Sequence, residues 1–300
     1  MTTDATPPTS HVGREIRRQP EAWTRALALL PEVAHLLPRP GERVAVLGCG
    51  TSWYMALAYA ALREASGAGE TDAFAASLFP TGRAYDRIVV ISRSGTTTEV
   101  LRAMETATAP VVGITAVPGL PVAQRADAAI VLDFADEQSV VQTLFATTTL
   151  MLLRASLGES LEPVVEQARA VLADAGPLPA ADAEQVSFVG SGWAYGIAME
   201  AGLKLREAAQ AWTESYPQLE YRHGPIAIAA PGRAVWVLGP SEPGLDRDVR
   251  ATGATLVDDD LDPVADLVRA QLLAVHRAEQ RGLDPDQPRH LTRSVVLEDS

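Results

Sequence analysis

The 300-residue sequence lacks the features that mark several large classes of protein. It contains one cysteine, Cys49, so no internal disulfide can form and no multi-cysteine metal site exists. Lys and Arg number 25 against 38 Asp and Glu, giving a formal net charge of −13, and no basic run occurs. Because affinity for the nucleic-acid backbone comes from clustered basic residues, a nucleic-acid partner is not expected. The single thiol follows an apolar run, so we expect a small buried residue rather than a nucleophile.

Long apolar runs and targeting segments are missing as well. No uninterrupted apolar stretch reaches the length that spans a bilayer. The N-terminal residues lack the charged and apolar regions of a signal peptide. The histidines show none of the short spacings typical of metal ligands. The sequence therefore predicts a cytoplasmic protein without a membrane partner, a metal ion or another cofactor.

Short runs rich in valine and isoleucine alternate with helical patterns rich in alanine and leucine along most of the chain. This alternation predicts an α/β fold in which helices cover both faces of parallel sheets. A Pro/Ala/Asp-rich stretch near Gly176 indicates a boundary between two halves. The expected strands are 43–47, 73–79, 87–92, 110–115, 129–132, 234–238 and 255–257.

The two halves begin with similar segments. RVAVLGCGTSWYMALAYAALREA and QVSFVGSGWAYGIAMEAGLKLREA each combine a strand pattern, a G-x-G turn and an alanine-rich helix pattern. Gly48 and Gly50 align with Gly190 and Gly192 at an offset of 142 (190 − 48 and 192 − 50). This repeat predicts two similar α/β halves. In GCGTSW the third glycine of a dinucleotide fingerprint is replaced by Trp53 and no Walker A lysine follows, so neither NAD nor ATP is expected.

Hydroxyl side chains are concentrated in ISRSGTTTEV, where an apolar run ends and a helical pattern begins. Two interpretations are open. The hydroxyls can cap the helix by accepting hydrogen bonds from its free amides. Alternatively, hydroxyls and amides together can form an anion site for a phosphate at the helix N-terminus. One residue usually suffices for capping, and this segment has five hydroxyls.

The segment AMEAGLKLREAA carries Glu200, Lys204 and Glu207 at a spacing of i, i+4, i+7, which places them on one face of a helix. The simpler interpretation is a solvated row of salt bridges. The alternative is a catalytic carboxylate with a basic partner, since a positioned carboxylate can transfer protons. His223 in YRHGPIAI is, taken alone, typical of a turn residue with one backbone bond.

These motifs together resemble the sugar isomerase (SIS) family, most closely the isomerase domain of glucosamine-6-phosphate synthase and the hexosamine-phosphate isomerase/deaminase group. GCGTS, SRSGTT, KLRE and EYRHGP carry the resemblance in this order, and it extends from about residue 43 to the C-terminus. It implies two tandem SIS subdomains, each a parallel-sheet αβα sandwich of flavodoxin-like type. We expect residues 1–42 to form an N-terminal tail and helix. The first subdomain would be 43–160, and the second would be 161–300, with a C-terminal tail over the active site.

The resemblance also implies a binding site for the substrate. Serine and threonine hydroxyls of the second motif would hold the sugar phosphate, and Arg93 stands where the synthase-like motif has glutamine. The segment EQSVVQTLFATT would line the other side of the pocket. The implied substrate-binding residues are Thr51, Ser52, Ser92, Arg93, Ser94, Thr97, Gln142 and Glu220.

Four residues receive chemical roles from the resemblance. Glu207 would remove the C2 proton, and Lys204 would bind the sugar or stabilise charge. His223 would assist ring opening in the active site of the neighbouring subunit, which implies a homodimer, and Glu220 would orient His223 or bind sugar hydroxyls. Arg293 stands where the synthase has a lysine. Arginine stays charged and cannot form a Schiff base, so proton return at C1 would differ.

The expected function is an enzyme acting on an amino-sugar 6-phosphate of the glucosamine or N-acetylglucosamine type. It would abstract the C2 proton, as an aldose–ketose isomerase/deaminase. One alternative is a dehydratase, because a C2 carbanion can expel a substituent at C3 and eliminate water. Another is a non-catalytic sugar-phosphate sensor. The glutaminase domain of the synthase has no counterpart, so an amidotransferase half-reaction is not expected.

Overall fold

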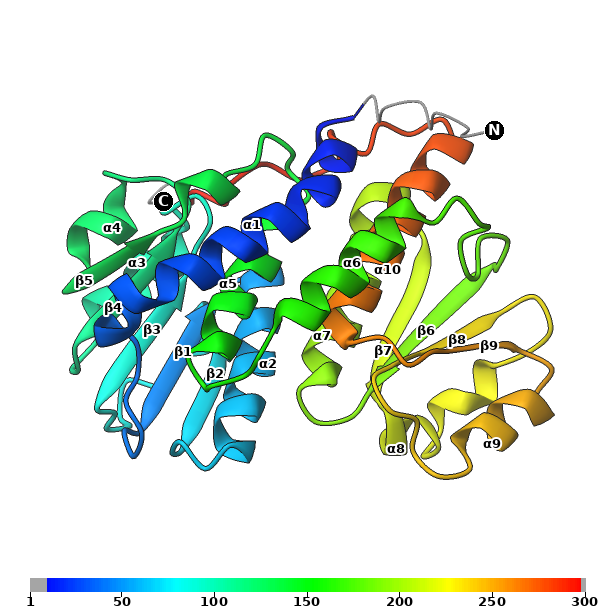
Figure 1. Ribbon diagram of the computed structural model, residues 1–300, viewed down its shortest axis with the longest axis horizontal. Coiled ribbons are helices and arrows are strands. Elements are labelled where there is room, and N and C mark those ends of the chain that lie inside the picture. The colour runs from blue at the N-terminus through cyan, green and yellow to red at the C-terminus, as the bar shows by residue number, and fades with distance from the viewer. Residues whose placement is uncertain (1–9, 298–300) are drawn as a thin grey trace. The chain divides into compact units, whose positions relative to one another are not determined.

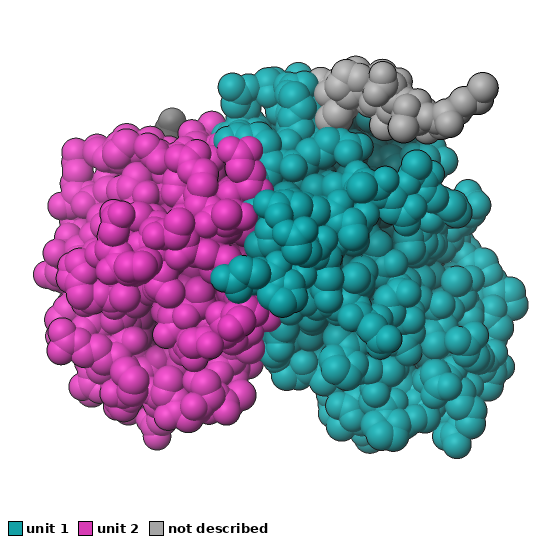
Figure 2. Space-filling view, in the orientation of Figure 1, with its two compact units in different colours: residues 1–20, 137–143, 162–291 teal, residues 21–136, 144–161, 292–300 magenta. Residues whose placement is uncertain are grey.

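The computed structural model describes residues 10–297, which form two compact units (Figure 2). Unit 1 comprises the described residues up to Pro20 together with 137–143 and 162–291. Unit 2 comprises 21–136, 144–161 and the described residues from Thr292 onward. Helix α1 (His11–Val33) contributes its first part to unit 1 and its remainder to unit 2. Each unit contains one parallel sheet.

The sheet of unit 2 has five parallel strands in the order β2-β1-β3-β4-β5 (Figure 1). Val46 of the central strand pairs with Ala73 on one side and Val89 on the other. All five residues of β1 and of β4 are buried, as expected for strands covered on both faces. The strands are β1 (Val44–Gly48), β2 (Thr71–Ala75), β3 (Arg87–Ile91), β4 (Val111–Thr115) and β5 (Ala128–Val131).

Helices cover both faces of this sheet. Leu47 and Val90 pack with Val100 of α3 and Val122 of α4 in one apolar cluster. Helix α2 contacts β1 and β2 and also packs on α5. The helices of this unit are α2 (Thr51–Ala65), α3 (Thr98–Glu105), α4 (Pro121–Arg125) and α5 (Leu144–Ala155), with short 3-10 turns at Ala34–Leu36, Ala76–Leu78 and Asp133–Ala135.

The sheet of unit 1 has four parallel strands in the order β7-β6-β8-β9. On one face Val235 and Val237 pack with Leu245 and Val249 of α9. Helix α7 contacts β6 and β7 and packs along α10, which in turn packs on α6. The elements are α6 (Glu162–Ala173), β6 (Gln185–Gly190), α7 (Ala194–Ala209), β7 (Trp212–Pro217), α8 (Gln218–Tyr221), a 3-10 turn (Pro225–Ile228), β8 (Ala234–Leu238), α9 (Leu245–Ala251), β9 (Thr255–Asp258) and α10 (Pro263–Gln280).

The internal repeat corresponds to β1–α2 in one unit and β6–α7 in the other. A Cβ atom at Gly48 would lie 2.5 Å from the carbonyl carbon of Ser52, and one at Gly190 would meet the backbone of Ala194. The second glycines, Gly50 and Gly192, have φ values of 53° and 55°. Glycine is therefore required twice in each turn, first for close packing of helix on strand and then for a left-handed backbone.

The predicted fold class is confirmed: both sheets are parallel and flanked by helices. The strand expected at 73–79 is wrong in its second half, because β2 ends at Ala75 and a 3-10 turn follows. Cys49 is half-buried, and burial raises the pKa of its thiol to about 11, which suits an unreactive side chain. Among the helices of residues 10–297, none combines the length and the apolar character needed to cross a bilayer.

Candidate functional site

The loops after β1 and β3 lie next to each other at one edge of the unit 2 sheet. In the order β2-β1-β3-β4-β5, the chain leaves β1 toward one side of the sheet and leaves β3 toward the other. Ligands of open α/β sheets bind at the carboxyl ends of strands at such a switch point. The residues found here are 48–52 after β1 and 92–97 after β3.

Hydroxyls in the loop 92–97 face one another. The Oγ of Ser92 lies 3.4 Å from the Oγ1 of Thr97, and the Oγ of Ser94 accepts a hydrogen bond from the Thr96 amide at 3.3 Å. Ser92 and Ser94 are buried. Thr97 is the N-cap residue of α3, yet its side chain makes no capping hydrogen bond. The helix-capping interpretation is therefore wrong for Thr97, and the anion-site interpretation stays a prediction.

The C-terminal segment lies along this loop. The Oγ of Ser94 donates to the Oγ of Ser294 at 3.1 Å, and the Thr96 and Ser294 hydroxyls are 2.9 Å apart. The Thr98 amide donates to the carbonyl of Val295 at 3.2 Å. The segment 293–297 thus contacts Ser94, one of the hydroxyls assigned to the phosphate, and the neighbouring Thr96.

Arg93 and Arg293 interact within the same unit. Arg93 is 1 % exposed, and its guanidinium donates to the carbonyl of Arg293 at 2.8 Å. The Arg293 guanidinium forms an ion pair with Asp136, at 2.5 Å between Nη2 and Oδ1. Arg93 therefore holds the C-terminal segment, a function that neither interpretation of the loop had suggested.

Thr51 and Ser52 open helix α2 and are both buried. Gly50 precedes them as the N-cap residue and has no side chain, so the first turn of α2 receives no side-chain cap. The Ser52 amide donates to the carbonyl of Cys49 at 3.1 Å. Thr51 and Ser52 follow β1, the strand that pairs with β3, and loop 92–97 follows β3.

The equivalent edge of the unit 1 sheet is built differently. The Ser191 hydroxyl after β6 donates to the Glu242 carboxylate at 2.9 Å, and the Glu242 amide donates to the Gln218 side chain at 2.8 Å. A carboxylate at this position repels an anion. Of the two switch points, the one in unit 2 suits a phosphate.

In unit 1, the charged face of α7 is buried. Lys204 Nζ lies 2.5 Å from Glu207 Oε2 and 3.3 Å from Glu200 Oε1. The side chains of Glu200 and Lys204 are 1 % exposed, and that of Glu207 is 18 % exposed. The interpretation as a solvated row of salt bridges is therefore wrong. The three residues form a buried cluster that reaches the surface at Glu207.

Electrostatics explain why Lys204 stays charged in this position. Burial acts to lower the pKa of Lys204, but the carboxylates of Glu200 and Glu207 outweigh it, and Glu137 adds to them, so the pKa is raised. One ammonium thus faces three carboxylates. Glu137 lies in the segment EQSVVQTLFATT, and its charge near Lys204 was not predicted from the sequence.

The loop 137–143 that carries Glu137 is held by buried carboxylates. Glu15 of α1 accepts a hydrogen bond from the Gln138 amide at 2.6 Å, and Glu137 accepts one from the Thr143 amide at 2.6 Å. Both carboxylates are buried. The Oε1 atom of Gln142 is buried and has no hydrogen-bond partner within the described part of the chain. This acceptor is thus available to a ligand.

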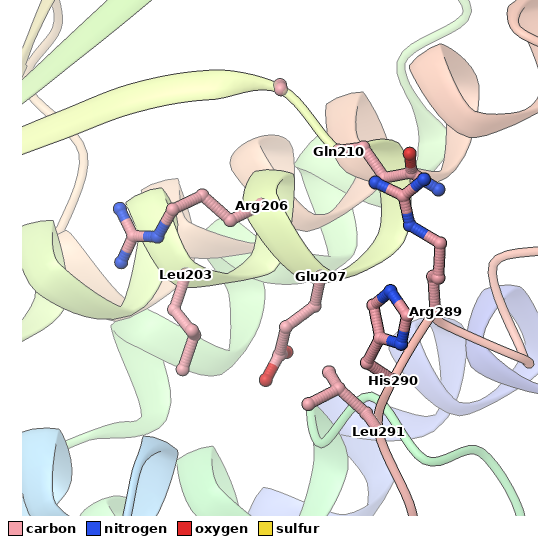
Figure 3. A pocket seen from close by; sticks show the side chains of 8 residues that line it. Leu203, Arg206, Glu207, Gln210, Arg289, His290 and Leu291 are labelled. Atoms are coloured by element: carbon pink, nitrogen blue, oxygen red, sulfur yellow. The ribbon is translucent and has the colours of Figure 1, made fainter.

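A cavity of about 400 Å³ opens beside Glu207 (Figure 3). Helix α7 and the turn after it form one wall, and the segment after α10 forms the other. The Glu207 side chain extends from α7 toward the side on which His290 and Leu291 lie (Figure 3). The lining includes Arg206, Glu207, Gln210, Arg289, His290 and Leu291. Arg289 and His290 were not singled out from the sequence, although a C-terminal tail was expected over the active site.

His223 and Glu220 lie elsewhere in unit 1. The His223 amide donates to the Glu220 carbonyl at 2.9 Å, as in one helical turn, and both side chains are exposed. Neither residue lines the cavity at Glu207. Within residues 10–297 no three His, Cys, Asp or Glu side chains are grouped as metal ligands.

Comparisons with known proteins agree with the resemblance found in the sequence. No family model matches the chain. The chain is 30 % identical to glutamine–fructose-6-phosphate aminotransferase (isomerizing) of Methanothermobacter thermautotrophicus over 95 % of its own length and 57 % of that protein. For the same enzyme of Gloeobacter violaceus the identity is 31 %, over 86 % of this chain and 52 % of the relative. The chain thus spans somewhat over half the length of these relatives.

Solved structures share the fold. Glucosamine-6-phosphate deaminase of Thermotoga maritima superimposes with a TM-score of 0.79 at 24 % identity, over 96 % of this chain and 100 % of the other. Tagatose-6-phosphate ketose/aldose isomerase of Escherichia coli gives a TM-score of 0.80 at 19 % identity, over 98 % and 99 % of the two chains. At these identities the likeness establishes the fold.

Proposed function

We propose that this chain, a member of the sugar isomerase (SIS) family, is an enzyme that removes the C2 proton of an amino-sugar 6-phosphate. The substrate would be of the glucosamine 6-phosphate or N-acetylglucosamine 6-phosphate type, and the reaction an aldose–ketose isomerisation with deamination. The observation that carries the proposal is the position of Glu207. Its carboxylate is held by a buried lysine and faces a cavity large enough for a small ligand.

Glu207 has the properties of a base for this reaction. It is partly exposed, so substrate can reach it, while its partner Lys204 is buried and cannot be displaced into solvent. A fixed carboxylate can take the C2 proton and return it to C1. Lys204 then stabilises the negative charge that develops on the substrate. Gln142, with an unpartnered acceptor, would bind a sugar hydroxyl or the amine.

The phosphate would be bound by unit 2. Ser92, Ser94 and Thr97 contribute hydroxyls at the carboxyl end of β3, and Thr51 and Ser52 contribute a helix start after β1. Hydrogen bonds to a charged phosphate contribute roughly 1.5–3 kcal/mol each. Ser94 is hydrogen-bonded to Ser294. We propose that the substrate phosphate replaces Ser294 as the partner of Ser94 when it binds. Arg93 would act through this segment.

His223 would act from a second copy of the chain. Its side chain is exposed and outside the Glu207 cavity, which suits a residue that serves a neighbouring subunit's site. In that role His223 would assist ring opening, with Glu220 orienting it or binding sugar hydroxyls. The protein would then be a homodimer with shared active sites.

Elimination is the second candidate reaction, and the observation in its favour is the presence of Arg293 where the family has a lysine. Arg293 replaces the family's lysine and is paired with Asp136, so it offers no amine for Schiff-base chemistry. A C2 carbanion that is not reprotonated at C1 can expel the C3 hydroxyl, which leaves as water with the proton that Glu207 took from C2. Glu207 would be the base in either route.

Product analysis distinguishes these reactions. The protein would be incubated separately with glucosamine 6-phosphate and N-acetylglucosamine 6-phosphate, and products followed by NMR and mass spectrometry. Fructose 6-phosphate with ammonia indicates deamination, whereas loss of water from an intact amino sugar indicates elimination. Binding of both sugars without turnover would disprove an enzymatic function and favour a sensor.

A further inference from the structure

Besides Glu207, the cavity is lined by one side chain that can both donate and accept a proton, His290. The remaining ionisable residues of the lining, Arg206 and Arg289, stay protonated in proteins. Isomerisation needs a group that gives a proton to oxygen while a base takes one from carbon. Among the residues that line this cavity, Glu207 and His290 are the pair that can do so.

The backbone at His290 is unusual. Within residues 10–297, three residues other than glycine have a positive φ: Ala180, Gln210 and His290. Two of these, Gln210 at 51° and His290 at 65°, line the same cavity. Residues other than glycine avoid positive φ values unless the surrounding structure holds them there, and such residues cluster at functional sites.

Hydrogen bonds on either side of the cavity hold its two walls. The Asp286 carboxylate accepts from the amides of His11 and Val12, at 2.6 and 2.8 Å, and so ties the segment before His290 to the start of α1. The Leu291 amide donates to the carbonyl of Pro288 at 3.3 Å, closing the turn that contains His290. Arg281, at the end of α10, donates to the carbonyl of Ala209 at the end of α7. The segment around His290 is therefore held by hydrogen bonds of its neighbours in the chain.

We propose that His290 is a further catalytic residue, the proton donor to O1 of the substrate while Glu207 takes the proton from C2. This role rests on the proposed function. The C2–H bond breaks and its proton goes to the Glu207 carboxylate. The electron pair forms the C1–C2 double bond, and the C1=O π pair becomes a lone pair on O1. O1 takes the proton from the His290 imidazolium, which becomes neutral imidazole.

The second half of the reaction restores both residues. Neutral His290 takes a proton from the nitrogen at C2, a C2=N double bond forms, and C1 takes the proton back from Glu207. Water then hydrolyses the imine to the ketose and ammonia. Over the cycle His290 returns to imidazolium and Glu207 to carboxylate. His290 thus performs proton transfers that Arg293 cannot, because an arginine keeps its protons.

The test uses His290→Asn, because asparagine tolerates a left-handed backbone but does not transfer protons near neutral pH. With glucosamine 6-phosphate we expect kcat to fall about 10²–10⁴-fold with little change in KM. The kcat of His290→Gly should be equally low and should recover in added imidazole. With a series of substituted imidazoles, the recovered rate should follow the pKa of the added compound. His276→Asn, a histidine of α10 outside the cavity lining, serves as the matched control and should keep its rate.

Two results would overturn the assignment. A His290→Asn enzyme that works at the wild-type rate, while Glu207→Gln is inactive, would remove His290 from the chemistry and leave the proposed function standing. A His290→Gly enzyme that is slow but not rescued by imidazole would show a structural role only. If the wild-type protein turns over neither sugar, the proposed function fails, and the role of His290 fails with it.

Discussion

The ammonium group of Lys204 lies 2.5 Å from the Glu207 carboxylate, at a point of helix α7 where the lysine side chain is 1 % exposed. Glu200, one turn earlier and equally buried, lies 3.3 Å from the same ammonium. A lysine in this position compensates two carboxylates at once. Its removal therefore affects stability and chemistry together, and the two effects have to be separated.

Replacing Lys204 by methionine should cost about 3–5 kcal/mol of unfolding free energy, because it leaves Glu200 buried without a cation. Turnover should be lost. The double variant Glu200→Gln with Lys204→Met should regain most of the stability and none of the turnover. Chemical denaturation and NMR product assays measure the two effects. Wild-type turnover in the double variant would contradict a chemical role of Lys204.

Ser92→Ala and Thr97→Val test the phosphate loop. Each removes one of two hydroxyls that lie 3.4 Å apart. Loss of a hydrogen bond worth roughly 1.5–3 kcal/mol should weaken binding of glucosamine 6-phosphate about 10- to 100-fold in isothermal titration calorimetry. Thr106→Ala is the control, since this hydroxyl bonds to the Ala103 carbonyl at the far end of α3. Unchanged affinity in both loop variants would exclude the loop as the phosphate site.

The hydroxyl of Ser294 joins the C-terminal segment to the loop through Ser94 and Thr96. Ser294→Ala should loosen the segment and speed hydrogen exchange at the amides of Thr98 and Leu297, whose partners lie across the same contact. Exchange measured by NMR provides the readout. Thr252→Ala, which alters a hydroxyl bonded within α9, should leave both amides unchanged. Equal exchange in wild type and Ser294→Ala would contradict a closing role of this residue.

Much of this architecture could be predicted because its signals are local. The spacing of Glu200, Lys204 and Glu207 defines one helical face, and the repeated G-x-G turns mark two strand–helix junctions. The residues that pack against a helical face come from distant parts of the sequence. Sequence periodicity does not reveal that Glu137, more than sixty residues earlier, contributes to the charge around Lys204 (204 − 137 = 67).

Two further features could not be predicted from the sequence, for physical reasons. Strand β7 was not expected, because an edge strand that is half-exposed and ends in Pro217 lacks a continuous apolar run. The role of His290 depends on a left-handed backbone that non-glycine residues adopt only when distant contacts hold them. The positions of both are set by tertiary structure rather than by local preference.

Asp266 provides a test of electrostatics away from the site. Burial raises the pKa of this carboxyl from 3.8 to about 6, although Arg269 and the Trp236 Nε1–H act to lower it. The folded protein therefore binds this proton more tightly than the unfolded chain does. The stabilising contribution is present below about pH 4 and is lost as the pH rises through 6.

Asp266→Asn stays neutral and should escape this loss. Relative to wild type, the variant should gain on the order of 3 kcal/mol between pH 4 and pH 7. Thermal unfolding at the two pH values measures the difference. Asp259 is the other carboxylate paired with Arg269, and its side chain is 44 % exposed. Asp259→Asn should therefore show no such gain in stability. A variant–wild-type difference that is the same at both pH values would contradict the account.

The proton at C2 of the substrate gives the most direct test of the central claim. Glucosamine 6-phosphate deuterated at C2 would be incubated with wild-type protein, with Glu207→Gln and with Glu214→Gln. Glu214 is a glutamate of β7 that accepts a hydrogen bond from the Tyr216 hydroxyl. We expect wild type and Glu214→Gln to remove the deuterium from C2 and deliver it to C1, or to solvent by exchange at the Glu207 carboxyl group. Glu207→Gln should remove it about 10²–10⁴-fold more slowly while still folded. Loss of deuterium from C2 in Glu207→Gln at the wild-type rate would show that another group removes the proton.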